Sequence, residues 1–159
     1  MRNRLGKAFE DHLSELQADM VSIALDYVDG SADGIFIYGA WEDGTSAFDV
    51  FYKINGYIVE KEKLNDALKA GESKYDTSDE RQSAMLNIGL DNLDSIEEKC
   101  GEFGREMPTE MRLHYDVRGN KLRAKYKYDR VFADDAELLP GNVFDAWIQS
   151  VSKGEPALG

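Results

Sequence analysis

The side chains able to do chemistry are few in this chain and stand far apart in sequence. There are two histidines, His12 and His114, and one cysteine, Cys100. None of the three stands at a metal-ligand spacing from another, so we predict no metal site and expect Cys100 to be a buried hydrophobe. His114 alternates with Arg112 and Asp116 on the polar side of a predicted strand. We interpret it as a surface residue or, alternatively, as a pH-sensitive contact in an interface.

Carboxylates are plentiful, and the group that best suits a metal cluster or an acid–base pair is Asp134, Asp135 and Glu137. No further ligand follows at an obvious spacing. The chain also lacks a nucleophile-elbow serine and a glycine-rich loop that follows a strand and opens a helix. We therefore interpret the group as a solvated loop and predict no catalytic residues, no cofactor and no enzymatic activity. A small hydrolase built on carboxylates is kept as an alternative, and it requires a concave pocket with shifted carboxylate pKa values.

Residues 111–128 carry the clearest structural pattern. Apolar and charged residues alternate on both sides of a short turn at Gly119 and Asn120, which predicts an antiparallel hairpin with one apolar face. The other face is mostly basic, with Arg112, Arg118, Arg123, Lys125 and Lys127. The tyrosines of the hairpin point away from this face, so it lacks aromatics on which bases could stack. We therefore predict a solvated face with cross-strand ion pairs and no nucleic-acid partner.

The remaining elements follow from periodicity and capping signals. Apolar residues spaced by three and four predict long helices over roughly residues 3–28 and 78–102, the second capped by Ser78. A short helix ended by Gly71 and a last helix opened by Pro140 are also expected. The predicted strands are 34–41, 47–54, 57–61, 111–117 and 122–128. Short hairpin links favour an α+β domain over residues 1–152, followed by a disordered tail over 153–159. Its mainly antiparallel sheet of about five strands packs against two long helices, with a short C-terminal helix.

Composition limits the class of protein. The chain has 159 residues, 42% of them hydrophobic, and a net charge of −12. One domain of this size buries about two-thirds of its unfolded surface. The acidic balance disfavours nucleic acid and anionic membranes and suits a basic partner, although many cytosolic bacterial proteins are acidic too. Acidic residues interrupt the N-terminal segment, and no stretch approaches the ~20 apolar residues of a membrane span, so we predict a soluble cytoplasmic protein.

The order of motifs resembles that of the YezG-like family of bacterial immunity proteins, the antitoxins of polymorphic toxin systems. The resemblance lies in a pair of aromatic strands, an acidic helix, a basic hairpin and a closing helix after an acidic connector: Ala47–Tyr52, Tyr57–Glu60, Ser78–Glu102, Met111–Tyr128, Pro140 and Trp147. It covers most of the chain. The resemblance implies a cytoplasmic α+β protein that binds and neutralises a cognate toxin domain, often a nuclease.

Our hypothesis from the sequence is a non-enzymatic immunity protein that blocks the active surface of a basic toxin. The candidate contacts are an aromatic anchor beside acids at a predicted turn and the acidic connector: Trp41, Glu42, Asp43, Asp134, Asp135 and Glu137. Trp41 is equally well interpreted as the rim of the core. The alternative function is a homodimeric adaptor or scaffold that uses an exposed sheet edge or face. The sequence leaves open whether the chain is a monomer or a homodimer.

Overall fold

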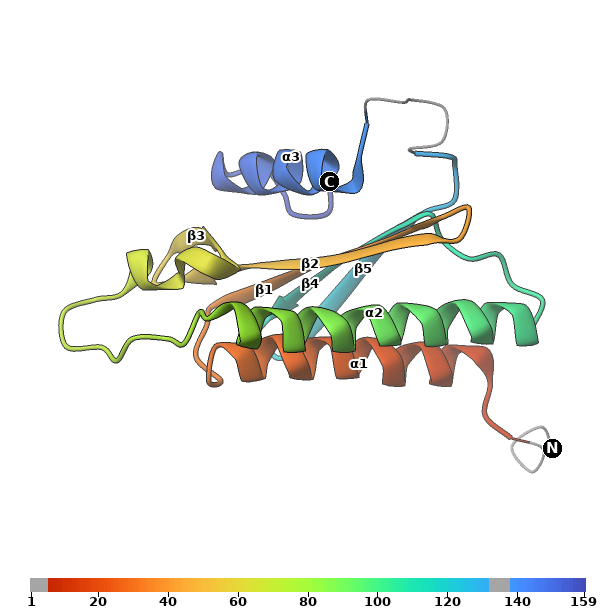
Figure 1. Cartoon of the computed structure of the whole chain (residues 1–159), viewed down its shortest axis with the longest axis horizontal. Coiled ribbons are helices and arrows are strands. Elements are labelled where there is room, and N and C mark those ends of the chain that lie inside the picture. The colour runs from red at the N-terminus through yellow and green to blue at the C-terminus, as the bar shows by residue number, and fades with distance from the viewer. Residues whose placement is uncertain (1–5, 132–137) are drawn as a thin grey trace.

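The computed structural model describes residues 6–131 and 138–159, and it arranges them in three layers (Figure 1). Two long helices, α1 (Phe9–Tyr27) and α2 (Asp79–Glu102), lie side by side on one face of a five-stranded sheet. A shorter helix, α3 (Pro140–Ser152), covers part of the opposite face. The α+β prediction is confirmed, with its five antiparallel strands, two long helices and short C-terminal helix. The position of α3 as a separate third layer is a finding of the structure.

The sheet is antiparallel throughout, with the strand order β3-β2-β1-β4-β5. Its strands are β1 (Gly34–Glu42), β2 (Thr45–Ile54), β3 (Tyr57–Glu60), β4 (Glu110–Asp116) and β5 (Lys121–Lys127). The central strand β1 is buried at nearly every residue, because the helices cover it from both sides. This explains why its sequence is apolar without alternation. The outer strand β5 is exposed at every residue except the half-buried Tyr126.

Local chemistry sets the element boundaries. The Asp43-Gly44 and Asn55-Gly56 pairs adopt positive φ at both positions, as two-residue hairpin turns require. The Ser78 hydroxyl accepts a hydrogen bond from the Arg81 amide, so the predicted cap of α2 is confirmed. The first helix begins at Phe9, later than expected. The segment Lys61–Ala67 forms a 3-10 helix, η2, in place of a helix that reaches Gly71.

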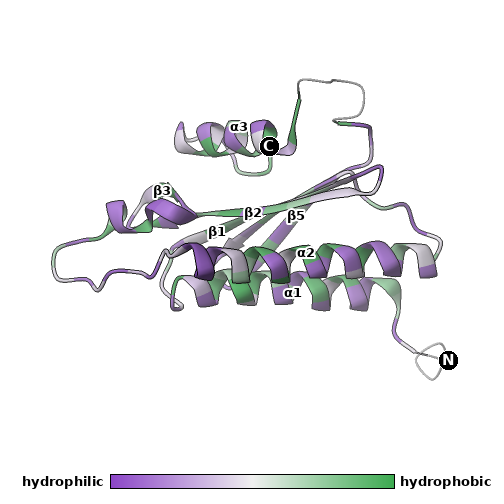
Figure 2. Ribbon diagram, viewed as in Figure 1, coloured by the Kyte–Doolittle hydropathy of each residue, from purple (hydrophilic) through white to green (hydrophobic). Residues whose placement is uncertain are grey.

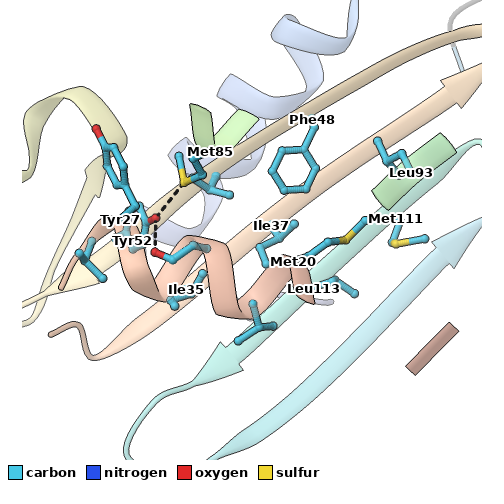
Figure 3. Packing of buried hydrophobic residues seen from close by; sticks show 14 of the residues in the cluster. Met20, Tyr27, Ile35, Ile37, Phe48, Tyr52, Met85, Leu93, Met111 and Leu113 are labelled. Atoms are coloured by element: carbon cyan, nitrogen blue, oxygen red, sulfur yellow. Dashed lines mark hydrogen bonds between the residues drawn. The ribbon is translucent and has the colours of Figure 1, made fainter. Parts of the chain in front are cut away.

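Two hydrophobic clusters hold the layers together. The larger lies between the sheet and α1 and α2, and Figure 3 shows Met20, Ile37 and Leu113 within it. In this cluster the Tyr52 hydroxyl donates a hydrogen bond of 2.7 Å to the Ala24 carbonyl oxygen of α1. The bond satisfies a buried polar group, as a closely packed interior requires. The smaller cluster lies under α3 and contains the aromatic side chains Phe36, Tyr38, Phe51, Phe144 and Trp147.

The C-terminal residues differ from the sequence-based expectation of a disordered tail over 153–159. They turn back towards α3, where the Trp147 indole N–H donates a hydrogen bond of 2.8 Å to the Ala157 carbonyl oxygen. Ala157 and Leu158 pack against the smaller cluster. The physical reason is that the buried indole N–H needs an acceptor, which a free tail would not supply.

Figure 2 shows polar and apolar residues alternating around α1 and α2, as expected for helices with one buried side. Within residues 6–131 and 138–159, no helix combines the length and the apolar character that crossing a membrane requires.

The packing of α2 on β2 depends on a glycine. A Cβ atom at Gly89 would overlap the buried ring of Phe48. We expect Gly89→Ala to lower the free energy of unfolding by about 1–3 kcal/mol, because the helix and the strand would have to separate. Gly101→Ala in the same helix is the control. A Cβ there meets nothing within 4 Å, so the substitution should be neutral or stabilise by up to about 1 kcal/mol. Equal urea-unfolding free energies for the two variants would contradict this account.

Candidate functional site

The charges of the molecule are separated between its layers. The helices α1 and α2 carry twelve acidic residues, all exposed, against two basic residues, Arg81 and Lys99. We call these acids the acidic helical face: Glu10, Asp11, Glu15, Asp19, Asp26, Asp79, Glu80, Asp91, Asp94, Glu97, Glu98 and Glu102. Asp91, Asp94, Glu97 and Glu98 take part in no ion pair between described residues. Their charge is therefore available to an external partner.

The opposite charge gathers on the other side of the sheet. The segment 110–127 holds six basic residues against Glu110 and Asp116. Four of them alternate along β5 and pair in register with β4 residues that face α3, so they lie on the α3 side of the sheet. We call these four the basic row: Lys121, Arg123, Lys125 and Lys127. The predicted basic face is thus exposed at the β5 edge, whereas α3 covers the aromatic residues of β1 and β2.

The predicted contact turn, Trp41–Asp43, closes the β1–β2 hairpin. The Glu42 side chain is only 8% exposed, and its carboxylate accepts a hydrogen bond of 2.6 Å from the Val131 amide. The exposed Asp43 carboxylate lies 3.1 Å from the Arg130 guanidinium. The turn is therefore joined to the chain that leaves β5. Glu42 serves this junction, while Asp43 and the half-buried Trp41 remain accessible to a partner.

The other predicted contacts, Asp134, Asp135 and Glu137, lie outside the residues that the structure describes. Glu42 and Asp43 hold Val131 and Arg130, two residues of the described chain, beside the hairpin turn. A partner contact by this acidic segment remains a prediction.

A buried charge network lies under α3 and was not predicted from the sequence. Glu110 is only 2% exposed; one carboxylate oxygen lies 2.9 Å from Nε of Arg112, and the other accepts a hydrogen bond of 3.1 Å from the Tyr38 hydroxyl. The Arg112 guanidinium lies over the Trp147 ring, 5.1 Å from its centroid. Burial, together with the charge of Glu110, raises the pKa of Tyr38 well above its usual range. The network thus joins β1, β4 and α3.

Breaking this network should be costly. We expect Glu110→Gln to lower the free energy of unfolding by about 3 kcal/mol, because it leaves the partly buried Arg112 guanidinium without its counter-charge. Glu106→Gln is the matched control. Glu106 is exposed and takes part in no ion pair between described residues, so its loss should change stability by less than about 0.5 kcal/mol. Urea unfolding of both variants measures the difference, and a cost for Glu110→Gln as small as the control's would refute this role.

His114, on the α3 side of the sheet, contributes to the walls of two hollows. Its ring stacks on Phe36 with centroids 4.6 Å apart, and Phe36 stacks in turn on Phe51. The hollows, about 810 and 580 Å³, share His114, Lys53 and Gly56 in their walls. Burial is the main cause that lowers the pKa of His114; Arg123 acts in the same direction, Asp116 opposes it, and Lys53 adds a weaker lowering effect. His114 is therefore a half-buried part of the aromatic stack.

The depressed pKa of His114 makes stability depend on pH. Burial makes protonation of His114 unfavourable in the folded state. The contribution of neutral His114 to the free energy of unfolding is therefore fully present above pH 6.5, the usual pKa of histidine. This contribution is lost as the pH falls through the pKa of His114 in the folded state. We expect the unfolding free energy of the wild type to fall more steeply below pH 6.5 than that of His114→Gln. Parallel pH profiles for His114→Gln and the wild type would contradict the prediction.

The other reactive groups have structural explanations. Cys100 is 2% exposed, and burial raises the pKa of its thiol, which disfavours the reactive thiolate. Burial also raises the pKa of Asp49, although the Lys61 ammonium at 2.9 Å opposes the shift. Over the described parts of the chain, no three His, Cys, Asp or Glu side chains gather closely enough to hold a metal ion.

Comparison with protein-family models and with curated proteins finds no match to this chain.

Proposed function

We propose that the chain is a non-catalytic immunity protein that binds and neutralises a basic toxin domain, such as a nuclease, in the cytoplasm. The observation that carries the proposal is the concentration of twelve exposed acidic residues on α1 and α2, with only two basic residues among them. A nuclease presents cations to the phosphates of its substrate, because phosphate contacts dominate its affinity. An acidic protein surface can occupy the same cations and exclude the substrate.

Charge on the acidic helical face would act mainly on the rate of association. Complementary charges raise association rates from about 10⁵–10⁶ M⁻¹s⁻¹ to as much as 10⁸–10⁹ M⁻¹s⁻¹ at low salt. Fast capture suits an inhibitor that has to bind a toxin before the toxin reaches its substrate. Asp91, Asp94, Glu97 and Glu98 are among the acids available for this role, because they form no ion pair with cations of the described chain.

Tight binding also needs apolar anchors at the centre of the interface. Aromatic residues commonly supply them, within interfaces that bury about 1,200–2,000 Å² in total. Trp41 is half-buried at the hairpin end, next to the exposed Asp43, and it suits this role. The full set of proposed contacts outside the helices is Trp41, Glu42, Asp43, Asp134, Asp135 and Glu137. Among them, Glu42 acts by holding the turn in place.

The proposal is tested by co-expression with the toxin gene that it places immediately upstream of the gene for this chain. Cells that produce the toxin domain should survive only when the chain is present, and the two proteins should elute together on gel filtration. Unchanged survival, the absence of such a neighbouring gene, or elution of this chain as a homodimer that ignores the toxin domain would each contradict the proposal. The last outcome would instead support a homodimeric adaptor.

Charge-neutralised variants locate the contact within the complex. We expect Glu97→Gln with Glu98→Gln to weaken toxin binding by about tenfold, mainly through slower association. Asp66→Asn with Asp145→Asn removes the same charge from exposed positions away from α1 and α2, and binding should stay close to wild type. Surface plasmon resonance at two salt concentrations measures both rates. Equal weakening by the two variants would show that net charge acts without a defined acidic surface.

A further inference from the structure

Among the described residues, no strand pairs with the outer side of the edge strand β5. In the strand order of the described residues, β5 neighbours only β4. It has seven residues, and all of them, from Lys121 to Lys127, pair with β4 without a bulge. The opposite edge, β3, has only four residues and runs directly into η2. An exposed edge of this length presents unpaired N–H and C=O groups that can accept another strand. Of the two edges of this sheet, β5 is therefore the one suited to strand addition.

The two faces of β5 have different chemistry. On the α3 side lies the basic row, in which only Lys127 approaches an acid of the described chain, with Nζ 3.9 Å from Glu110. Lys121, Arg123 and Lys125 form no ion pair within residues 6–131 and 138–159. On the other side lie Leu122, Ala124 and Tyr126; Leu122 is 37% exposed, although it is a large apolar residue. A strand placed beside β5 would therefore meet cations on one face and apolar groups on the other.

An apolar hollow continues the second face beyond the end of β5. It measures about 250 Å³ and lies between α1, the end of α2 and the end of β5. Its wall is mostly apolar, with two charged residues, Arg105 and Glu106, beside Phe9, Leu13, Ile96, Cys100, Pro108, Tyr126 and Tyr128. Tyr128 is 46% exposed. Exposed apolar surface beside an open strand edge is a liability unless a partner covers it. The hollow has room for an apolar side chain from an added strand.

A second copy of this chain does not suit the β5 edge. Two β5 strands paired with each other would bring two basic rows together on one side of the joined sheet. Like charges on neighbouring strands destabilise the pairing, and lysines on an edge are a known means of preventing self-association. The edge therefore selects a strand of opposite charge.

We propose that β5 is a docking edge for an extended segment of a partner protein in which acidic and apolar residues alternate. The segment adds as a sixth strand. Its acidic side chains meet the basic row, and its apolar side chains lie along Leu122 and reach the hollow at Tyr128. Backbone hydrogen bonds supply affinity and the alternating side chains supply specificity, as in other cases of strand addition. The basic row lies across the sheet from the acidic helical face, whereas Leu122 and the hollow lie on the helical side. The inference does not depend on what the acidic helical face binds.

The test uses the full chain and a seven-residue probe peptide, equal in length to β5, in which glutamate and valine alternate. The peptide should bind the chain in a fluorescence anisotropy titration and should slow amide hydrogen exchange in β5. A peptide with alternating lysine and valine should not bind. The glutamate–valine peptide with N-methyl groups on alternate residues should also lose binding, because it can no longer form the strand hydrogen bonds. Failure of the unmodified peptide to bind, or equal binding by its N-methylated form, would overturn the proposal.

Protein variants provide the second arm. Arg123→Glu with Lys125→Glu should weaken binding of the glutamate–valine peptide by about tenfold or more. Lys63→Glu with Lys69→Glu makes the same charge change at exposed positions around η2 and is the matched control. Circular dichroism confirms the fold of each variant, and the N-methylated peptide tests the wild type without any substitution. If both variants weakened peptide binding equally, the net charge of the chain would account for the effect, and this result would count against a site on β5.

Discussion

The strand β1 lies at the centre of the sheet with both faces buried: Ile35 and Ile37 point towards α1 and α2, and Phe36 and Tyr38 towards α3. Each such side chain contributes about 1.5–3 kcal/mol when it is fully buried. Leaving two of them uncovered would use up much of the ~5–15 kcal/mol that stabilises a small domain. The double burial of β1 therefore requires a layer on each side, and it explains why α3 and the residues after it close over the sheet.

Burial declines from β1 towards the β5 edge, and the charges follow this gradient. In β4 the residues facing α1 and α2, Met111 and Leu113, are buried, whereas Arg112 and His114 on the other face are half-buried. In β5 nearly all residues are exposed. The half-buried cation Arg112 needs Glu110 and the Trp147 ring, while the cations further out need no partner from the fold. Charge that is costly in the interior thus accumulates at the edge, where water solvates it.

Elements set by local pattern were predictable from the sequence, and features set by distant contacts were not. The hairpin turns at Asp43-Gly44 and Asn55-Gly56 and the Ser78 cap depend on neighbouring residues, so they follow from residue types alone. The burial of Glu110 depends on Tyr38, 72 positions away in the chain, and no local pattern reports it. The same holds for the burial of Glu42 and its hydrogen bond with the Val131 amide, 89 positions away in the chain. Alternation along the chain predicts that the basic row lies on one face of a strand. Only the strand order of the folded sheet shows that this strand is at the edge.

The thickness of the helical layer keeps the two charged surfaces electrically independent. An α-helix with its side chains is about 10–12 Å across, and the Debye length at physiological salt is about 8 Å. The acids on the outer side of α1 and α2 are therefore largely screened from the basic row on the far side of the sheet. The net charge of −12 describes neither surface. The acidic helical face attracts basic groups, which the basic row repels, and the basic row attracts acidic groups, which the acidic helical face repels. A charged partner would thus be oriented before contact, with its basic surface turned to the helices and any acidic strand turned to β5.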